Sequence, residues 1–378
     1  MKIAFIIGEI HPNAGQTYDI SEIIKFLLPR HSDWEFFVLT PKIHYPIVEG
    51  MKNRRVRIVQ LHQYYVALLF RKRLSKMLKA YDILYIKGNF PYVFPAVKSG
   101  KPTILVVHQM DSPKLFHGMG QKLKIIGANL LTAYVIKKPD AVVTITDELA
   151  TSYKNRYGIT VHVIEDQISD LYFSAPARVE PGKSQVFKLL TAGNWDGPHG
   201  RKRHDFLLHC FADAVKIMPN LRISMVGLSE RNLIDLGLLS EGLKVKEYVT
   251  LKGYLNEKAL LEEFVASHTY VTATTYEGFY RQIVEGFATG MPAVVYDAYA
   301  ITRNLSSSAS ANHVLKSGAG LLYLDSKSFV ESLKNVVENY SLFSSRARSY
   351  AIIFSGKLTG LKTENLLERM ANEKRKSK

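Results

Sequence analysis

The sequence predicts an α/β protein with two doubly wound domains, each a parallel sheet flanked by helices, and three observations support this fold class. Short β-branched apolar runs alternate with longer amphipathic segments, which is the pattern of parallel strands joined by helices. The length of 378 residues exceeds what one ordinary core accommodates, so two domains are expected. A segment rich in proline and small residues, Ser174–Ser184, separates two blocks of this alternation and is typical of a linker.

Each block contains its own set of expected strands. In the first domain, residues 1–173, they are Ile3–Ile7, Glu35–Leu39, Val56–Gln60, Ile83–Ile86, Thr103–Val107, Ala141–Thr144 and Val161–Ile164. In the second domain, residues 186–349, they are Phe187–Ala192, Arg222–Val226, Val249–Lys252, Tyr270–Ala273, Ala293–Tyr296 and Leu321–Leu324. Residues 350–372 are expected to form a C-terminal helix that crosses back to the first domain. Two such domains facing a cleft bind ligands at the carboxyl ends of their strands.

Composition indicates a soluble globular protein, with 47% apolar and 22% charged residues. The single cysteine, Cys210, lies in an apolar helical run and is expected to be a reduced core thiol in a cytoplasmic protein. The apolar run Ile3–Ile7 is too short for a signal peptide, and no segment reaches the length of a membrane span. We therefore expect a cytoplasmic protein, or one that is peripheral at the inner face of the membrane.

The formal net charge of +16 predicts an anionic partner. Nucleic acid is not expected, because the basic residues are not organised into a recognisable reading motif with stacking aromatics. The amphipathic segment Tyr64–Lys79 carries five basic residues, and Lys114–Lys138 repeats this mixture. Both segments suit docking on acidic phospholipids. Helices that simply cover the first sheet and expose solvated charge explain them equally well.

The most informative stretch is Thr275–Val295. A strand is expected to end near Ala273, a turn carries Glu277 and Gly278, and a helix is expected from about Phe279. A glycine-bearing turn between a strand and a helix offers backbone N–H groups and the positive helix end to a phosphate.

Two glutamates in this stretch, Glu277 and Glu285, are eight residues apart. A nucleotide sugar has hydroxyl groups on both the transferred sugar and the ribose, and two carboxylates at different depths would accept hydrogen bonds from each. The alternative is that Arg281 and Glu285 form a surface ion pair, while Glu277 only favours the helix N-terminus.

This stretch resembles the Glu-x7-Glu signature of the retaining GT-B glycosyltransferases of family 4, also called group 1. The signature residues that the chain keeps are Glu277, Gly278, Phe279, Glu285, Ala288, Gly290, Pro292, Val294 and Val295. Tyr280 stands where glycine is usual, and Gly286 stands where alanine is usual. The resemblance implies that Glu277 lies near the donor sugar and Glu285 on the ribose. It also implies donor contacts for the loop residues Gly278, Phe279 and Tyr280.

Similarity to the same family extends along the chain. The segment Val249–Leu260 resembles the part that binds the nucleotide base, which implies roles for Gly253, Tyr254 and Leu255. The basic run Gly200–Asp205 resembles the segment that brings a lysine to the diphosphate. Lys202 is the first choice for this role, with Arg201 or Arg203 as alternatives, and a solvated basic run is the competing interpretation.

The first domain contributes two residues to the implied site. Gly15 follows the first strand and precedes a helix that is expected from about Asp19. The family usually has paired glycines here, which approach the diphosphate and the acceptor. His108 ends the strand Thr103–Val107, where the family has a histidine near the transferred sugar. The usual Pro-Asn-Gly of the family is absent from His162–Phe173.

The function implied by this resemblance is that of a retaining, hexosyltransferase-like glycosyltransferase. It would move a sugar from a UDP- or GDP-sugar to a glycan or lipid-linked acceptor, with His108, Glu277 and Lys202 as the catalytic residues. No Asp-x-Asp motif or ligand cluster stands out, so we expect no metal and no cofactor besides the nucleotide-sugar donor. The alternatives are a nucleotide-sugar epimerase and a non-catalytic GT-B protein that binds nucleotide sugars or glycans.

Overall fold

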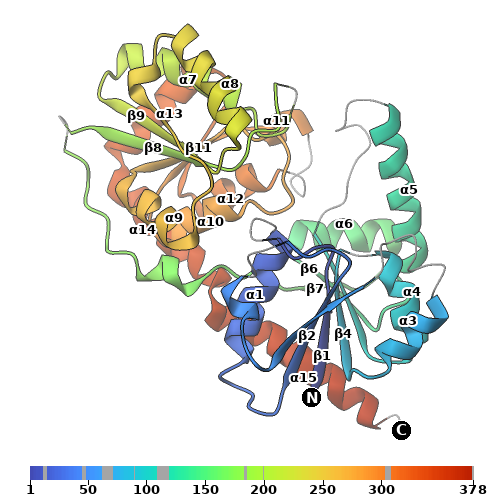
Figure 1. Ribbon diagram of the computed structural model, residues 1–378. Helices are drawn as coiled ribbons and strands as arrows, with labels where there is room; N and C mark the ends of the chain where they lie inside the picture. The colour runs from blue at the N-terminus through green and yellow to red at the C-terminus, as the bar shows by residue number, and fades with distance from the viewer. Residues whose placement is uncertain are drawn as a thin grey trace. The chain divides into compact units, whose positions relative to one another are not determined.

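The computed structural model describes residues 1–11, 15–44, 48–61, 71–88, 90–108, 119–182, 185–198, 200–302 and 308–376. The chain divides into two compact units: the first comprises Met1–Ile168 with Phe354–Lys378, and the second comprises Ser169–Ile353 (Figure 1). Each unit has a parallel sheet with helices between its strands, so the predicted fold class of two doubly wound domains is confirmed.

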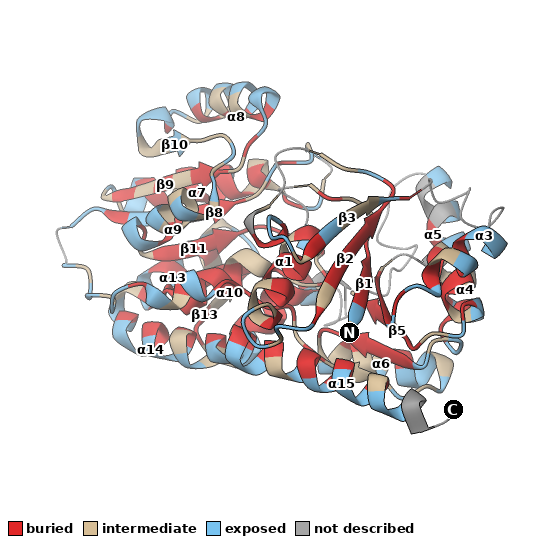
Figure 2. Cartoon of the chain, turned by 60° about the horizontal axis from the view of Figure 1, so that its bottom comes forward, coloured by how far each residue is buried: buried red, intermediate tan, exposed pale blue. Residues whose placement is uncertain are grey.

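The sheet of the first unit has the strand order β3-β2-β1-β4-β5-β6-β7, and every neighbouring pair is parallel. Its strands are β1 (Lys2–Ile6), β2 (Glu35–Thr40), β3 (Val56–Gln60), β4 (Ile83–Lys87), β5 (Thr103–Val107), β6 (Ala141–Thr144) and β7 (His162–Val163). The central strands are buried, because helices cover both faces of such a sheet (Figure 2). The strand order reverses between β1 and β4, where doubly wound sheets bind ligands.

The helices of the first unit come from both ends of its sequence. They are α1 (Gly15–Leu27), η1 (Glu49–Met51), α3 (Arg71–Leu78), α4 (Phe90–Lys98), α5 (Met119–Val135), α6 (Asp147–Tyr157), η7 (Gly356–Gly360) and α15 (Leu361–Lys376). Helix α15 packs Leu366 and Leu367 into the core formed with β1 and α1. Its Glu364 is bound by Arg30, with Nη2 2.9 Å from Oε2, and by His31, with Nε2 2.5 Å from Oε1.

The sheet of the second unit has the strand order β10-β9-β8-β11-β12-β13, again all parallel. Its strands are β8 (Phe187–Ala192), β9 (Leu221–Val226), β10 (Val249–Leu251), β11 (Thr269–Thr272), β12 (Ala293–Tyr296) and β13 (Gly320–Tyr323). Its helices are η3 (Asp170–Ser174), α7 (His204–Ile217), α8 (Glu230–Gly242), η4 (Lys246–Tyr248), α9 (Glu257–Ala266), α10 (Arg281–Ala288), α11 (Ala298–Thr302), α12 (Ala309–Ser317), α13 (Ser326–Glu338), α14 (Tyr340–Ala351) and η6 (Ile352–Phe354).

The proline-containing segment that begins at Ser174 belongs to the second unit. Arg178 holds it there by donating hydrogen bonds to the carbonyl oxygens of Thr289, at 3.0 Å, and Phe264, at 2.7 Å. These carbonyls lie near the ends of α10 and α9, where helices leave carbonyl groups without intrahelical partners. A single guanidinium therefore joins this segment to two helix ends.

Two helices begin at positions that differ from the predicted ones. Helix α1 begins at Gly15 instead of near Asp19, so the predicted glycine is the first helical residue. Helix α10 begins at Arg281, two residues after the predicted start at Phe279, and Tyr280 is the residue before it. Helix boundaries depend on tertiary contacts, and the contacts of Tyr280 account for the second difference. No helix in the described part of the chain is long and apolar enough to cross a membrane.

Candidate functional site

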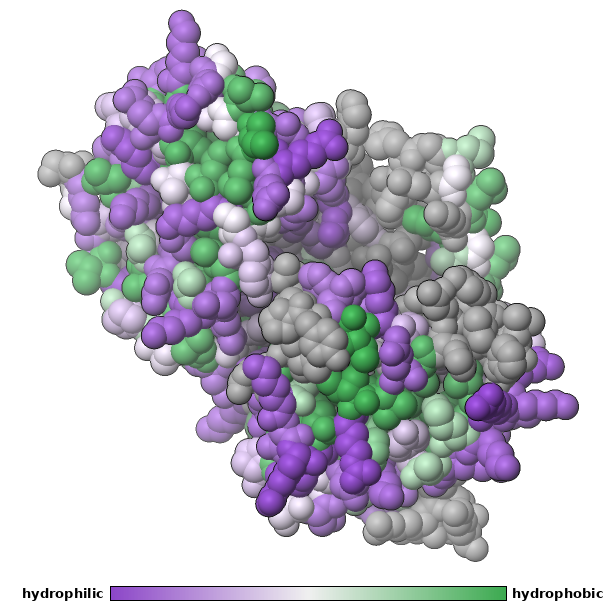
Figure 3. Space-filling view, viewed as in Figure 1, coloured by the Kyte–Doolittle hydropathy of each residue, from purple (hydrophilic) through white to green (hydrophobic). Residues whose placement is uncertain are grey.

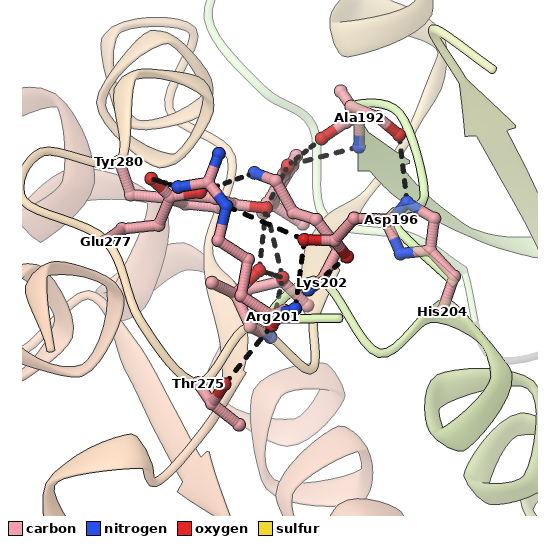
Figure 4. A network of polar contacts seen from close by, with 12 residues as sticks. Ala192, Asp196, Arg201, Lys202, His204, Thr275, Glu277 and Tyr280 are labelled. Atoms are coloured by element: carbon pink, nitrogen blue, oxygen red, sulfur yellow. Dashed lines mark hydrogen bonds and ion pairs between the residues drawn. The ribbon is translucent and has the colours of Figure 1, made fainter. Parts of the chain in front are cut away.

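The site in the second unit is built from two loops at the carboxyl edge of its sheet. Strands β8 and β11 are neighbours and run parallel, so the loops that follow them, residues 193–203 and 273–280, leave the sheet at the same edge. The backbone N–H of Thr275 donates to the carbonyl oxygen of Arg201 at 2.9 Å (Figure 4). This bond joins the basic run of one loop to the acidic turn of the other.

Asp196 organises the first loop. Its carboxylate accepts hydrogen bonds from the backbone N–H groups of Arg201 and Lys202, both at 3.0 Å. A Cβ atom on Gly200 would lie 2.1 Å from Oδ1 of Asp196, so this close approach requires glycine. Asp196 was not among the predicted site residues, although the turn-forming residues Gly197 and Pro198 after it are a signal that a side chain could cap a turn there.

Glu277 binds both of the basic residues that Asp196 positions. Oε2 of Glu277 lies 2.9 Å from Nη1 of Arg201, and Oε1 lies 2.8 Å from Nζ of Lys202. The Lys202 ammonium also lies 4.3 Å from the centre of the Tyr280 ring, within the range of a cation–π interaction (Figure 4). The structure therefore brings together three of the predicted site residues with Tyr280.

Lys202 is a buried cation. Burial lowers its pKa, but the Glu277 carboxylate and Tyr280 raise it, and the net result is a raised pKa. Lys202 is therefore protonated at neutral pH, and Arg201 is charged as well. Both cations contact the Glu277 carboxylate, and Nε of Arg201 also lies 3.7 Å from Oδ2 of Asp196. The Arg201 side chain is 48% exposed, so an anionic group can approach this cation and compete with the carboxylates.

The side chain of Arg203, the second alternative for the diphosphate contact, points in a different direction from those of Arg201 and Lys202. Its guanidinium carbon lies 4.1 Å from the ring centre of Phe206 and 4.7 Å from that of Tyr296. Its backbone is left-handed, with φ of 46°, which costs a non-glycine residue about 1 kcal/mol. Of the three basic residues, only Arg201 and Lys202 meet Glu277.

His204 lies beside Lys202 but adds no charge. Its Nε2 donates to the carbonyl oxygen of Gly193 at 2.9 Å. Burial lowers the pKa of His204 to about 4, although the bond to Gly193 opposes this shift. The ring is therefore neutral at physiological pH and does not weaken the ion pair of Lys202 with Glu277.

Tyr280 is buried beneath the site. Its hydroxyl lies 3.0 Å from Oγ1 of Thr272 and 3.3 Å from the hydroxyl of Tyr270. The backbone φ of Tyr280 is −102°, so this position does not require the glycine that the family usually has. Its ring packs against the Lys202 ammonium. Any contact of Tyr280 with the nucleotide-sugar donor would therefore involve the backbone of Tyr280.

The remaining predicted residues of this unit lie in three places. Gly278 and Phe279 form the turn before α10, and the Phe279 ring lies 5.3 Å from that of His313. Glu285 lies inside α10 and is 2% exposed, so it is not a surface residue, as the alternative of a surface ion pair with Arg281 assumed. Gly253, Tyr254 and Leu255 follow β10 at the same sheet edge, and Gly253 accepts a hydrogen bond from the N–H of Gly227 at 3.0 Å.

In the first unit, His108 lies beside a buried charged cluster at the carboxyl edge of the sheet. Lys87 ends β4, is 1% exposed, and binds Asp19 as well as Asp166, whose Oδ1 lies 2.9 Å from Nζ. Nδ1 of His108 lies 3.7 Å from Oδ2 of Asp166. Burial, Asp19 and Asp166 together raise the pKa of the neighbouring Tyr85. The cluster has one cation and two carboxylates.

Lys87, Asp19 and Asp166 were not among the predicted site residues. The available signal was Lys87, a lysine that ends an otherwise apolar strand. The predicted strand Ile83–Ile86 ended one residue before it. Gly15 begins α1, and a Cβ atom built on it would have no other atom within 4 Å, so its surroundings are open. Parts of the predicted basic segments, residues 64–70 and 114–118, lie outside the described residues.

A group with the geometry for a metal ion occurs among the described residues at His31, Glu364 and Glu368 in the first unit. Nε of Arg30 already donates to both oxygens of Glu364, at 3.1 and 3.0 Å. A guanidinium in that position repels a metal cation. We therefore interpret this group as the ionic contact that holds α15 on the first unit.

Comparison with known proteins identifies the class of protein that carries this site. Residues 28–166 match the family model "Glycosyltransferase Family 4", and residues 186–339 match the model "Glycosyl transferases group 1". The chain therefore belongs to the group 1, or family 4, glycosyltransferases. No significant match was found among curated protein sequences.

Solved structures of similar fold cover almost the whole chain. A glycosyltransferase from Rickettsia africae has a TM-score of 0.72 at 14% identity, covering 98% of both chains. The Anabaena protein HepE in complex with UDP has a TM-score of 0.72 at 15% identity, covering 98% of this chain and 100% of its own. WaaG, a glycosyltransferase involved in lipopolysaccharide biosynthesis, has a TM-score of 0.70 at 14% identity, covering 96% and 99%. The fold is GT-B.

Proposed function

We propose that this protein transfers a hexose from a UDP- or GDP-sugar to a glycan or lipid-linked acceptor, with retention of configuration and without a metal ion. The observation that carries the proposal is the pair of cations, Arg201 and Lys202, held on one carboxylate at the ligand-binding edge of a doubly wound sheet. The Anabaena protein of similar fold was crystallised with UDP and with UDP-glucose, which supports a uridine nucleotide.

The two cations would stabilise the leaving diphosphate. Breaking the bond between sugar and phosphate places negative charge on the departing oxygen, and donors already aimed at that charge are the largest single catalytic effect, about 100- to 1000-fold per donor. Lys202 and Arg201 are restrained by Asp196, Tyr280 and Thr275, so they need little reorganisation. In this role they replace the metal ion that would otherwise neutralise a diphosphate.

Binding of the diphosphate would also change the position of Glu277. The carboxylate of Glu277 contacts both cations. A diphosphate bound by the same cations competes with that carboxylate, and the released Glu277 would then accept hydrogen bonds from hydroxyl groups of the donor sugar. We propose no nucleophilic role for Glu277. The acceptor would attack from the face that the phosphate leaves, and the phosphate would accept its proton.

Other residues would position the two substrates. Glu285 would accept hydrogen bonds from the ribose, and the backbone of Gly253, Tyr254 and Leu255 would bind the base. Gly278 and Phe279 would offer N–H groups to the phosphates, because they precede the N-terminus of α10. Gly15 and His108 lie at the carboxyl edge of the first sheet, and we propose that they contact the acceptor and the transferred sugar.

Thermal unfolding with a panel of nucleoside diphosphates tests the donor site. UDP or GDP above its dissociation constant should raise the melting temperature, because a ligand of the folded state stabilises it. Lys202→Ala and Glu285→Ala should weaken that shift, and chelators should leave it unchanged. Arg203→Ala is the matched control, since Arg203 is the adjacent basic residue but points to Phe206 and Tyr296.

Two outcomes would contradict the proposal. One is a wild-type protein that responds to no nucleoside diphosphate. The other is a shift that survives both Lys202→Ala and Glu285→Ala. If binding is established, a labelled donor and NMR analysis of the product anomer distinguish retaining transfer from inversion and from epimerisation of the donor.

A further inference from the structure

Helix α5 has two apolar faces, and among the described residues only one of these faces is buried. The covered face carries Ile125, Thr132 and Val135, which are 8%, 6% and 0% exposed. The other face carries a set of large apolar side chains that we call the α5 stripe: Met119, Leu123, Ile126, Leu130 and Tyr134, which are 74%, 60%, 44%, 68% and 63% exposed. In the space-filling view, apolar side chains lie along the edge of the first unit where Figure 1 shows α5 (Figure 3).

The spacing of the α5 stripe makes it one continuous surface. At 3.6 residues per turn its five side chains lie within about 80° around the helix axis, roughly opposite the covered face. The exposed face of a helix in a soluble protein is normally polar, and a contiguous exposed apolar patch marks an interaction surface. The proposed sugar-transfer chemistry makes no use of this surface.

The part of the sequence that contains the α5 stripe is strongly basic. Residues 71–139 contain thirteen Lys and Arg and two Asp, a net charge of +11 out of +16 for the whole chain, and of these cations Lys87 is buried against Asp19 and Asp166. Helix α3 packs on α4, and α4 packs on α5 (Figure 1). The exposed basic side chains of these helices and of the turn after α5 include Arg71, Lys72, Arg73, Lys76, Lys98, Lys137 and Lys138. Nζ of Lys138 lies 4.4 Å from the ring centre of Tyr134, at the end of the stripe.

We propose that the α5 stripe enters the headgroup region of an anionic lipid bilayer, while the basic side chains of α3 and α4 and of the turn after α5 contact its phosphates. Aliphatic side chains would bury little apolar surface against a nucleic acid, because its exposed surface is phosphate and sugar. A second copy of this chain would bring the same exposed basic side chains together. An anionic bilayer offers both an apolar interior for the stripe and negative charge for its surroundings.

Vesicle co-sedimentation of the purified protein tests this proposal without any donor. We expect binding to vesicles of phosphatidylcholine with phosphatidylglycerol and none to phosphatidylcholine alone, with affinity falling as salt rises. Leu123→Asp with Leu130→Asp should weaken binding at least tenfold. Lys72→Glu with Arg73→Glu should weaken it at low salt, at about fivefold or more for each cation lost. Unchanged melting temperatures show that these exposed substitutions preserve the fold.

The control is an exposed apolar residue outside this basic region. Leu238 on α8 is 63% exposed, and residues 228–250 around it carry three basic and four acidic residues. Leu238→Asp should leave vesicle binding unchanged. The fluorescence emission of a tryptophan placed at position 130 should shift to shorter wavelength when anionic vesicles are added, whereas that of a tryptophan at position 238 should not.

Three results would overturn the proposal. The first is a wild-type protein that ignores anionic vesicles. The second is equal binding by the Leu123→Asp, Leu130→Asp variant. The third is a dimer in solution that this variant dissociates, with no binding to lipid. Because nucleotide binding is measured separately, failure here leaves the donor site of the second unit untouched.

Discussion

The two sheets place clusters of different charge balance at the same topological position. In the second unit two cations, Arg201 and Lys202, contact the carboxylate of Glu277, and Nε of Arg201 also lies 3.7 Å from Oδ2 of Asp196. In the first unit one cation, Lys87, is bound by two carboxylates, Asp19 and Asp166. Both clusters lie at carboxyl ends of parallel strands, where a doubly wound fold receives its ligands.

The two clusters also differ in exposure. Lys87 is 1% exposed and is enclosed by its partners, whereas the Arg201 side chain is 48% exposed and can reach a ligand. A buried cluster that is enclosed by its own partners maintains local structure, and an open cluster can exchange one of its internal carboxylates for an anion. The difference is consistent with the proposal that the second unit binds the charged leaving group, while the first unit holds His108 beside the carboxylate of Asp166.

The largest expected effect comes from removing the buried cation of the first unit. Lys87→Met leaves two buried carboxylates without their partner, and breaking such a group costs about 3–5 kcal/mol of unfolding free energy. Urea unfolding measures this loss, and calorimetry should find nucleoside diphosphate affinity unchanged. Lys202→Met should cost less stability, since Arg201 still neutralises Glu277. Equal losses of unfolding free energy for Lys87→Met and Lys202→Met would contradict this distinction between the two clusters.

The next effect is a pH dependence specific to the second unit. The folded-state pKa of His204 is about 4, and the usual value is 6.5. The unfolded chain therefore binds more protons between these values, and the unfolding free energy falls as pH decreases from 6.5 to 4, by up to about 3 kcal/mol. His204→Gln should flatten this part of the stability profile. A variant whose profile runs parallel to that of the wild type in this window would show that His204 is not buried in its neutral form.

The smallest effect tests the exchange of Glu277 for a ligand. Glu277→Gln removes the carboxylate that competes for Arg201 and Lys202, so UDP or GDP affinity should rise roughly fivefold, the cost of one partly exposed ion pair. Turnover with the complete donor should fall, because the hydroxyl groups of the donor sugar lose the carboxylate that accepts their hydrogen bonds. Titration calorimetry and kinetics measure the two quantities. Weaker nucleotide binding by this variant would mean that Glu277 stays on the cations when the ligand is bound.

Much of the fold could be predicted from local pattern. The strands Phe187–Ala192 and Thr103–Val107 have the predicted bounds, because buried parallel strands appear as unbroken apolar runs between turn residues. The start of α10 could not be predicted to the residue. Tyr280 is buried by Tyr270 and Thr272, and that contact depends on strands that come together only in the fold.

The same limit applies to the site. Sequence similarity singled out Glu277, Lys202 and Arg201, but their spacing could not distinguish Arg201 from Arg203. The backbone bond from Thr275 to Arg201 and the rings of Phe206 and Tyr296 separate these two arginines. The roles of the predicted site residues stay predictions until the variants are measured.

What this sequence determined by itself was the alternation of strands and helices, the two sheets, and the residue types suited to a nucleotide sugar. These follow from hydrophobic periodicity and turn chemistry, which act between residues close in sequence. Tertiary structure alone decided that Asp196 positions Lys202, that Lys87 lies between Asp19 and Asp166, and that α5 exposes an apolar stripe. Each of these depends on which distant segments become neighbours and which faces they leave uncovered.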